Sequence, residues 1–233
     1  RRRGRCIRDS DMRVKRIGQV YMTGTVTEKD TAIAKKYLKK AVGLGNEDAK
    51  YTLAKLYADT KSEQLDIEKA IRLFADCADN HQHEHAAYQL GKLFLNGELV
   101  QKDISAAVKY FMMSANLKNQ YAQYQLGKLY LLGEDVLRDI SKAVTYLKQS
   151  AEQDNEHAAY QLGKLYLKGE FTERDIPQAV SYLTRSACLG NQFAQYQLGR
   201  QFLTGELTPK DIPAAIRYLK LSAEQDNQYA QYQ

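Results

Sequence analysis

Three histidines alternate in the run HQHEH, at His81, His83 and His85. A turn that holds them could present two imidazoles to zinc or nickel, because both metals accept nitrogen ligands. No cysteine or carboxylate set completes a metal site at a familiar spacing, and His85 matches His157 two repeat periods later. A polar turn is therefore the favoured interpretation, and we expect no metal and no other cofactor.

Two other residue types recur at a fixed spacing. The tyrosine row consists of Tyr88, Tyr124, Tyr160 and Tyr196, and the basic row of Lys92, Lys128, Lys164 and Arg200. Aromatic faces beside ammonium groups could bind an extended or helical peptide with acidic residues, or could track a nucleic-acid strand. Both rows also have structural explanations, with rings packed between neighbouring units and lysines in solvent.

A third position, three residues before each tyrosine, alternates in type. It holds His85, Tyr121, His157 and Phe193. Together with the two rows, these residues form the predicted partner-binding surface. The sequence contains no nucleophile paired with a base, no phosphate-binding loop and no paired carboxylates, so we predict no enzyme activity; any catalytic domain would lie outside this chain.

The elements that position these residues follow from a repeat of 36 residues. The segment YQLGKL begins at Tyr88, Tyr124 and Tyr160, and YQLGRQ begins at Tyr196. A period this strict predicts a stacked array in which neighbouring units share one core. The predicted units are 12–47, 48–84, 85–120, 121–156, 157–192 and 193–228, with a partial unit at 229–233.

Each unit contains two predicted helices, helix A and helix B, with apolar residues at helical spacing. In the fourth unit Gly133 ends helix A, Asp139 caps helix B, and Asn155 is expected in the left-handed conformation that closes the unit. Glycines inside helix A indicate close approach of helix B, and alanines in helix B would permit it. The glycines are Gly91, Gly127, Gly163 and Gly199; the alanines are Ala107, Ala143, Ala179 and Ala215; the predicted caps are Asp103, Asp139, Asp175 and Asp211.

This pattern resembles the Sel1-like repeat, a relative of the tetratricopeptide repeat. The matching residues of the fourth unit are Ala122, Leu126, Gly127, Tyr130, Gly133, Asp139, Ala143 and Ala151. The resemblance implies an all-α, right-handed α-solenoid of six antiparallel helix pairs plus the start of a seventh. It also implies a non-catalytic scaffold or adaptor that binds a protein or peptide, with helix A lining the concave face.

Two departures from the family pattern stand out. Sel1-like units usually carry glycine where this chain has Asp154 and Asp226. The second unit lacks both helix A glycines, with Ala54 and Thr60 in their places, and it has one extra residue near Asn80. We therefore expect an irregularity in the second unit.

Positive charge is concentrated at the start of the chain. Residues 1–16 contain eight basic and two acidic side chains, a balance of 8 − 2 = +6, and the remainder balances at 26 − 26 = 0. We assign residues 1–11 to a basic arm or linker. Its arginines are Arg1, Arg2, Arg3, Arg5 and Arg8. Such an arm can be a solvated linker or can bind nucleic acid, an acidic protein surface or an anionic membrane.

A second resemblance concerns the parent protein. The segment NQYAQYQLGKLYLLG is similar to arrays that follow the catalytic domain of some bacterial plasmid-mobilisation relaxases. This resemblance implies an accessory module that contacts DNA through the basic arm. None of the relaxase catalytic motifs is present.

Cysteine usage and hydropathy suggest the compartment. Cys6, Cys77 and Cys188 are odd in number and do not recur from unit to unit, so reduced thiols and a cytoplasmic location are expected. No run approaches the ~20 apolar residues of a membrane span, and no membrane partner is expected. The absence of an initiator methionine suggests a piece of a longer protein.

Overall fold

The computed structural model describes residues 2–24, 28–206, 208–225 and 227–231, without the side chains of residues 2–11 and 229. The described residues form helices and contain no strand. Six helices belong to a first compact unit, Arg1–Leu117: α1 (Arg2–Thr23), α2 (Thr31–Gly43), α3 (Glu47–Ala58), α4 (Ile67–His81), α5 (Glu84–Asn96) and α6 (Ile104–Asn116). The second unit, Lys118–Gln233, contains α7 (Gln120–Leu132), α8 (Ile140–Glu152), α9 (Glu156–Lys168), α10 (Ile176–Cys188), α11 (Gln192–Thr204), α12 (Ile212–Ala223) and α13 (Gln228–Gln231).

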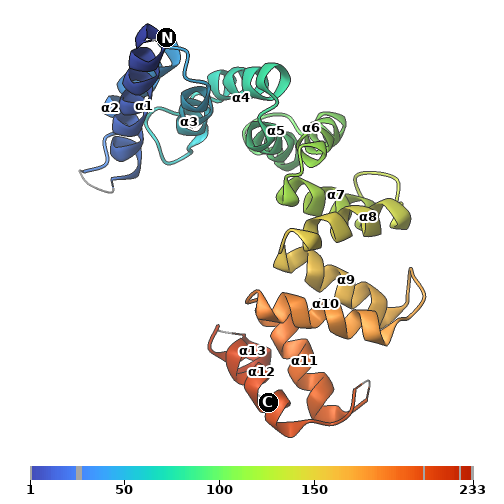
Figure 1. Ribbon diagram of the computed structural model, residues 1–233. Helices are drawn as coiled ribbons and strands as arrows, with labels where there is room; N and C mark the ends of the chain where they lie inside the picture. Colours follow the sequence, from blue (N-terminus) through green and yellow to red (C-terminus); the bar gives the residue numbers. More distant parts are fainter. Residues whose placement is uncertain (1, 25–27, 207, 226, 232–233) are drawn as a thin grey trace. The chain divides into compact units, whose positions relative to one another are not determined.

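Within each unit, successive helices pack as antiparallel A and B pairs (Figure 1). In the α5 and α6 pair, Ser114 contacts Glu84 while Tyr110 contacts Phe94, so residue numbers fall on one helix as they rise on the other. The core of the first unit joins α2, α3, α4 and α5, and two smaller clusters fill the second unit. The all-α architecture predicted from the repeat is confirmed.

The predicted helix boundaries have the predicted causes. A carboxylate of Asp103, Asp139, Asp175 or Asp211 accepts a hydrogen bond from the backbone N–H three residues later at the start of each helix B. Such a cap stabilises a helix by about 1 kcal/mol. Gly133 ends α7 at φ 69°, a conformation that favours glycine. Both interpretations are therefore confirmed.

The predicted role of Asn155 is wrong. Asn155 has extended backbone angles and is the N-cap of α9, where its side chain accepts from the N–H groups of His157 and Ala158. The left-handed residue is the one before it, Asp154, at φ 62°. Gly190, at φ 102°, stands at the same place one repeat later, which explains why the family favours glycine there.

The close approach of paired helices is confirmed, and the atoms nearest to Gly127 and Gly163 belong to leucines of helix B. A Cβ added to Gly127 would lie 2.7 Å from Cγ of Leu147, and a Cβ on Gly163 would lie 2.7 Å from Cγ of Leu183. The nearest atoms thus belong to the leucine one turn beyond Ala143 or Ala179. These alanines are fully buried and leave that space to the leucine.

Two further contacts recur in several of the pairs. In α8, the buried hydroxyl of Ser150 donates to the carbonyl of Gln120 at 2.7 Å, and the same contact recurs between Ser186 and Glu156. At the other end of the pair, aromatic rings of helices A and B stack almost in parallel with centroids 6.0 to 6.3 Å apart. The stacked pairs are Tyr21–Tyr37, Phe94–Tyr110, Tyr130–Tyr146, Tyr166–Tyr182 and Phe202–Tyr218.

The second repeat is irregular within α4. This helix has 15 residues where most helices B have 13, and it ends at the left-handed residue Gln82. Ala54 replaces the helix A glycine and is fully buried. Cys77 stands where other repeats have the buried serine, and burial raises the pKa of its thiol to about 11. The extra residue predicted near Asn80 thus lies in the last turns of α4.

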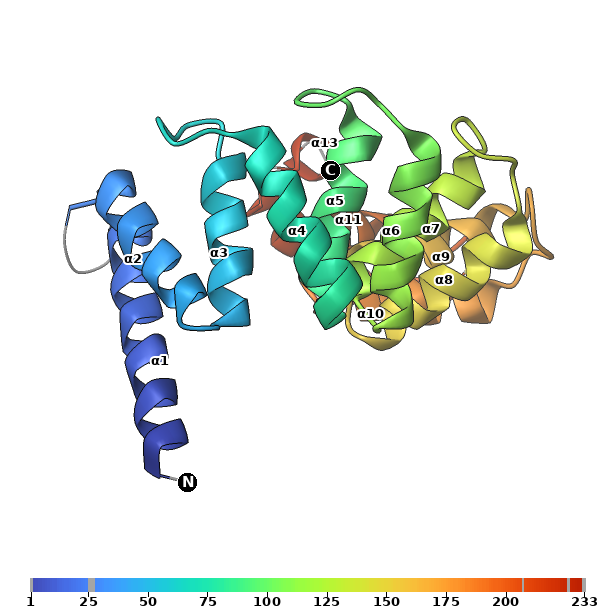
Figure 2. The same ribbon diagram turned by 90° about the horizontal axis from the view of Figure 1, so that it is seen from above.

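The basic arm lies outside the described side chains. Arg1 is not described, and the backbone of Arg2, Arg3, Arg5 and Arg8 belongs to α1, which has 22 residues and extends beyond α2 (Figure 2). No secondary-structure break therefore separates residues 2–11 from residues 12–23. Among the described residues, no helix combines the length and the apolar composition that crossing a membrane requires.

We predict that Gly127→Ala lowers the free energy of unfolding by about 1 to 3 kcal/mol, since a Cβ would overlap Leu147. The urea midpoint, followed by circular dichroism, measures the change. Gly43→Ala is the control, because nothing lies within 4 Å of a Cβ at that helical position, and alanine should raise stability by up to about 1 kcal/mol. Equal midpoints for the two variants would contradict the packing argument.

Candidate functional site

The predicted partner-binding residues lie on the helices A, and the third position is the most exposed part of this surface. Tyr121 in α7 is 51% exposed and Phe193 in α11 is 48% exposed. The His85 and His157 side chains are also exposed. Leu132, near the carboxyl end of α7, is 46% exposed. Aromatic and aliphatic side chains with this exposure are suited to contact a partner.

The tyrosine row packs between successive helices A. The ring of Tyr124 lies 5.9 Å from that of His157, and the ring of Tyr160 lies 6.0 Å from that of Phe193. Tyr124 and Tyr160 thus contact the third position of the next repeat. In the first unit, Tyr51 makes the same contact with His85 at 6.3 Å. Sequence reasoning missed Tyr51, although it precedes Ala54 by the same three residues that separate Tyr88 from Gly91.

The polar end of each tyrosine also bonds across this junction. The hydroxyl groups of Tyr51, Tyr124 and Tyr160 are hydrogen-bonded to glutamines of the next helix A, and burial raises the pKa of each hydroxyl above its usual value. The three glutamines are Gln89, Gln161 and Gln197. These tyrosines are therefore half-buried junction residues, and the packing explanation accounts for their contacts.

The basic row lies beside the tyrosine row. The Lys164 ammonium is 5.4 Å from the ring centroid of Tyr160, and the Arg200 guanidinium is 5.9 Å from that of Tyr196. Lys92 with Tyr88 and Lys55 with Tyr51 repeat the arrangement, so Lys55 extends the basic row to the second repeat. The attraction between a cation and an aromatic face holds the cation near the ring, and its charge remains available to solvent and ligands.

A groove runs between adjacent helices A in the second unit. It has a volume of about 280 Å³ and lies between α7 and α9. Leu131, Leu132 and Leu165 give it apolar walls, and Lys164 lines it with a cation. Phe171 contributes its ring, which the guanidinium of Arg138 covers at 5.1 Å. This groove combines apolar surface with three cations and two carboxylates, Glu134 and Glu170, a balance of 3 − 2 = +1.

The corresponding groove of the first unit is larger. It lies between α1 and α3 and has a volume of about 580 Å³. Met22, Thr52 and Lys55 occupy the positions that Leu131, Gln161 and Lys164 occupy in the second unit. The groove continues to Tyr51 and His83, beyond the limit of the groove in the second unit.

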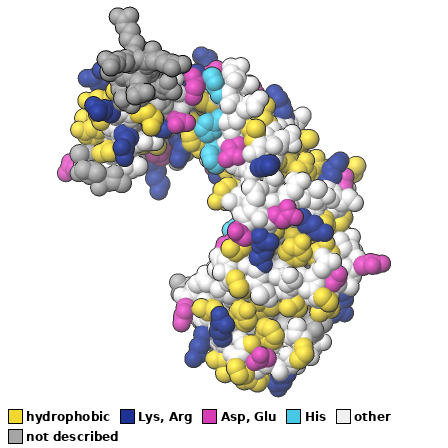
Figure 3. All heavy atoms as spheres, in the orientation of Figure 1, with side chains coloured by type: hydrophobic (Ala, Val, Ile, Leu, Met, Phe, Trp, Pro, Cys, Tyr) yellow, Lys and Arg dark blue, Asp and Glu magenta, His cyan; other side chains and the backbone are white. Residues whose placement is uncertain are grey.

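The three histidines of the HQHEH run have separate roles. His83 is the N-cap of α5: its Nδ1 accepts a hydrogen bond from the Ala86 N–H at 3.2 Å, and its ring stacks on Tyr51 at 4.5 Å. Other repeats use asparagine at this position, as Asn119 and Asn155 do. In Figure 3 histidine side chains form a band next to acidic side chains on the first unit.

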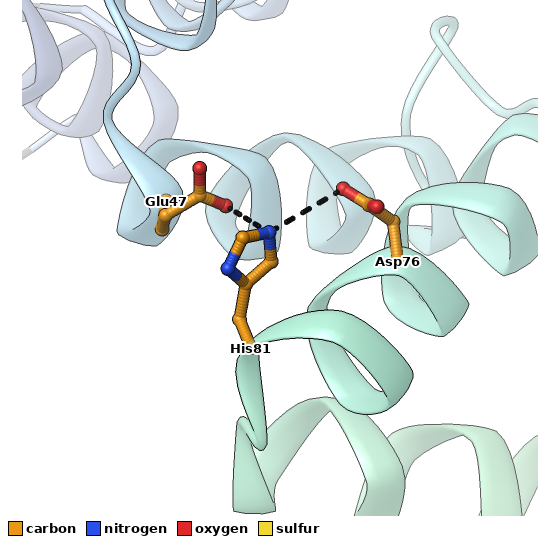
Figure 4. Close-up of side chains that lie close together, drawn as sticks. All are labelled: Glu47, Asp76 and His81. Atoms are coloured by element: carbon orange, nitrogen blue, oxygen red, sulfur yellow. Dashed lines mark ion pairs between the residues drawn. The ribbon is translucent and has the colours of Figure 1, made fainter.

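His81 instead joins a cluster of charged groups. Its Nε2 lies 2.9 Å from Glu47 Oε2 and 4.0 Å from Asp76 Oδ2, and Figure 4 shows the imidazole between the two carboxylates. These three groups have the atom types and proximity of a metal site. The Lys50 Nζ, however, lies 2.9 Å from Glu47 and 2.8 Å from Asp76, so this ammonium supplies a cation to the cluster.

The pKa shifts in the cluster agree with Lys50 as the cation that the two carboxylates bind. Hydrogen bonds to Asp76 and Glu47 raise the pKa of Lys50, and the hydrogen bond from Lys50 lowers the pKa of Asp76. Both shifts favour the charged pair. Sequence reasoning found His81 but missed its partners, because Glu47 and Asp76 are 29 residues apart and meet only through the packing of α3 on α4.

The geometry defines a class of protein, an all-α repeat protein whose helix pairs stack as a solenoid. The Sel1 repeat model matches residues 16–46, 84–119, 120–155, 156–191 and 192–227, more than half of the chain. The chain belongs to the Sel1 repeat family. The irregular second repeat is the segment that falls between the first two matches.

Solved structures support the same fold. The protective antigen c5321 of uropathogenic Escherichia coli, described as displaying an SLR fold, is 27% identical with a TM-score of 0.85; the match covers 95% of this chain and 47% of that one. A Sel1 repeat protein from Oxalobacter formigenes is 28% identical with a TM-score of 0.80, covering 92% and 88%. This chain thus spans about half the length of the first relative. Among curated protein sequences, none matches significantly.

We predict that His83→Asn removes a pH dependence of stability. Burial and the neighbouring His85 lower the pKa of His83, so the folded protein favours the neutral ring that caps α5. The unfolded chain binds the proton more readily, and stability is therefore lost as the pH falls below the ordinary histidine pKa of about 6.5. Asp48 and Glu84 are nearby and oppose this shift.

Urea unfolding at pH 7.5 and pH 5.0 measures the effect. The natural chain should lose about 1 kcal/mol more than His83→Asn over this interval, the usual contribution of an N-cap. His81, His85 and His157 are present in both proteins, so the comparison isolates the change at position 83. An identical pH dependence in the two proteins would show that the His83 cap is energetically silent.

Proposed function

We propose that this array is a non-catalytic protein-binding scaffold whose ligand lies along the exposed side of helix A. Sel1 repeat proteins are typically interaction scaffolds and generally non-catalytic, and this chain shares their fold. The observation that supports the face most directly is the second-unit groove, where leucines of α7 and α9 lie beside Lys164 and Lys168.

The chemistry of this face favours a segment with acidic and apolar residues. Phe193, Tyr121 and Leu132 are about half exposed and supply apolar area. Lys164 and Arg200 keep their cations over tyrosine rings at the same face. Aromatic contacts contribute most to affinity, while complementary charge raises the association rate and selects the partner.

The alternative, contact with nucleic acid as an accessory module of a DNA-mobilisation relaxase, rests on the basic arm. Its arginines precede the described side chains, and no contact among the described residues of the array favours a nucleic acid over a protein segment. A cytoplasmic location is part of the proposal and rests on the free thiols of Cys77, which is buried, and Cys188, which is exposed.

A selection from a random peptide library tests the scaffold proposal. Peptides enriched on the natural array should carry acidic and apolar residues, and their affinity should fall by about tenfold or more in a variant with Lys128→Glu, Lys164→Glu and Arg200→Glu. Fluorescence anisotropy of labelled peptides gives the dissociation constants. The charge-matched control has Arg174→Glu, Arg217→Glu and Lys220→Glu, which lie off the helices A.

Equal losses in the two charge-reversal variants would contradict a ligand on the helix A face. The DNA alternative is tested separately with labelled single-stranded DNA. We expect any binding to disappear when Arg2, Arg3, Arg5 and Arg8 are replaced by glutamine. Strong, steeply salt-dependent binding that survives these changes would contradict the scaffold proposal.

A further inference from the structure

The first junction of the array differs from the others in its unit-to-unit contact. Lys15 in α1 stands at the tyrosine position, three residues before Gly18, and Asp48 in α3 stands at the third position. Where other repeats pair two aromatic rings, the Lys15 Nζ and Asp48 Oδ2 form an ion pair at 2.8 Å. Both residues of the contact differ from those of other repeats, since Lys15 replaces the tyrosine and Asp48 replaces the aromatic residue at the third position. The replacement changes the chemistry of one junction while the stacking of α1 on α2 is retained.

This replacement coincides with the enlarged groove of the first unit. In the second unit, Leu131 of α7 and Gln161 of α9 are the lining residues of the groove that lie nearest to the ring pair Tyr124–His157 in the sequence. The ring pair itself is not part of the lining. In the first unit Lys15 and Asp48 are themselves part of the lining. Lys15 and Asp48 carry no rings, so this junction leaves open the space that the tilted ring pairs Tyr124–His157 and Tyr160–Phe193 fill in the second unit.

The enlarged part has an aromatic wall. Tyr51 is half-buried, and its ring lies 4.5 Å from His83 and 6.3 Å from His85, so the three rings form one side of the groove. Met22 of α1 faces the same space. Methionine and aromatic groups make favourable contacts with an inserted ring.

The charged residues of the groove determine which residues of a partner can flank the inserted ring. Lys15 and Lys55 are positive and Asp48 is negative, a balance of 2 − 1 = +1. Asp48 is already engaged by Lys15, and this hydrogen bond lowers the pKa of its carboxyl group. The groove therefore presents a net positive charge beside an aromatic surface, which favours carboxylates next to an inserted ring.

We infer that the groove between α1 and α3 is a specific docking site for an aromatic side chain of a partner protein, flanked by acidic residues. The partner ring takes the place that an aromatic pair fills at the other junctions, against Tyr51 and His83. Its flanking carboxylates pair with Lys55 and Lys15. This inference rests on the proposed scaffold function and names one site and one ligand chemistry on the helix A face.

Synthetic peptides test this site directly, because the chain contains no tryptophan and the fluorescence of a peptide tryptophan has no background. The probe is Ac-Gly-Trp-Glu-Glu-Gly-amide. Its matched controls replace tryptophan by alanine, with a fluorescent label, or both glutamates by lysine. We expect saturable binding of the probe and about tenfold or weaker binding of each control.

The decisive variant carries Lys15→Tyr and Asp48→His, which restores the residue types of the other junctions and leaves the net charge unchanged at neutral pH. It should bind the probe at least about tenfold more weakly while its urea midpoint is unchanged or higher. Lys55→Gln, which keeps the groove open, should weaken binding roughly threefold and reduce its salt dependence.

Undiminished probe binding by the Lys15→Tyr/Asp48→His variant, or no saturable binding by the natural chain at millimolar peptide, would overturn the inference. Preferred binding of the lysine peptide would overturn its charge assignment. These results are separable from those for the scaffold proposal, because charge reversal at Lys128, Lys164 and Arg200 changes the second unit and leaves this groove intact.

Discussion

The close approach of helix A to helix B is the constraint on which the array depends. At Gly127 and Gly163 the facing leucine leaves no room for a Cβ. The glycine and the leucine of such a pair are therefore both fixed by the same contact. A buried serine at one end and a stacked ring pair at the other then hold pairs such as α7 with α8 in a single arrangement. With the pair fixed, the exposed sides of the helices and the junctions between repeats can vary without disturbing the core.

The junctions explain why one motif has two roles. In YQLGKL, the leucine and glycine serve the helix pair, and the tyrosine joins its repeat to the next through a ring contact such as Tyr124–His157. The lysine lies over the tyrosine and remains a charge at the surface, as Lys164 does over Tyr160. Binding surface and junction therefore share residues, and a change at one junction position alters the groove beside it.

Much of the fold could be predicted from the sequence, because residues that recur at a fixed spacing indicate their structural roles. Asp139 and Gly133 act through neighbours a few residues away, so their roles as helix boundaries follow from local chemistry. The roles of Asn155 and Leu147 could not be assigned so directly. Asn155 adjoins the left-handed residue and a single-residue shift separates the two roles, while the contact of Leu147 with Gly127 depends on the axial offset of the two helices.

The candidate site was harder to predict where the repeat pattern breaks. Tyr51 lacks the flanking glycine that marks the tyrosine row. Lys15 and Asp48 are 33 residues apart, and neither has the aromatic residue type found at its position in other repeats. The most direct measurement is a map of amide chemical shifts in the natural chain during titration with the tryptophan–glutamate peptide. Shifts concentrated at Lys15, Thr52 and Lys55 would support the account; shifts concentrated on the helices B would contradict it.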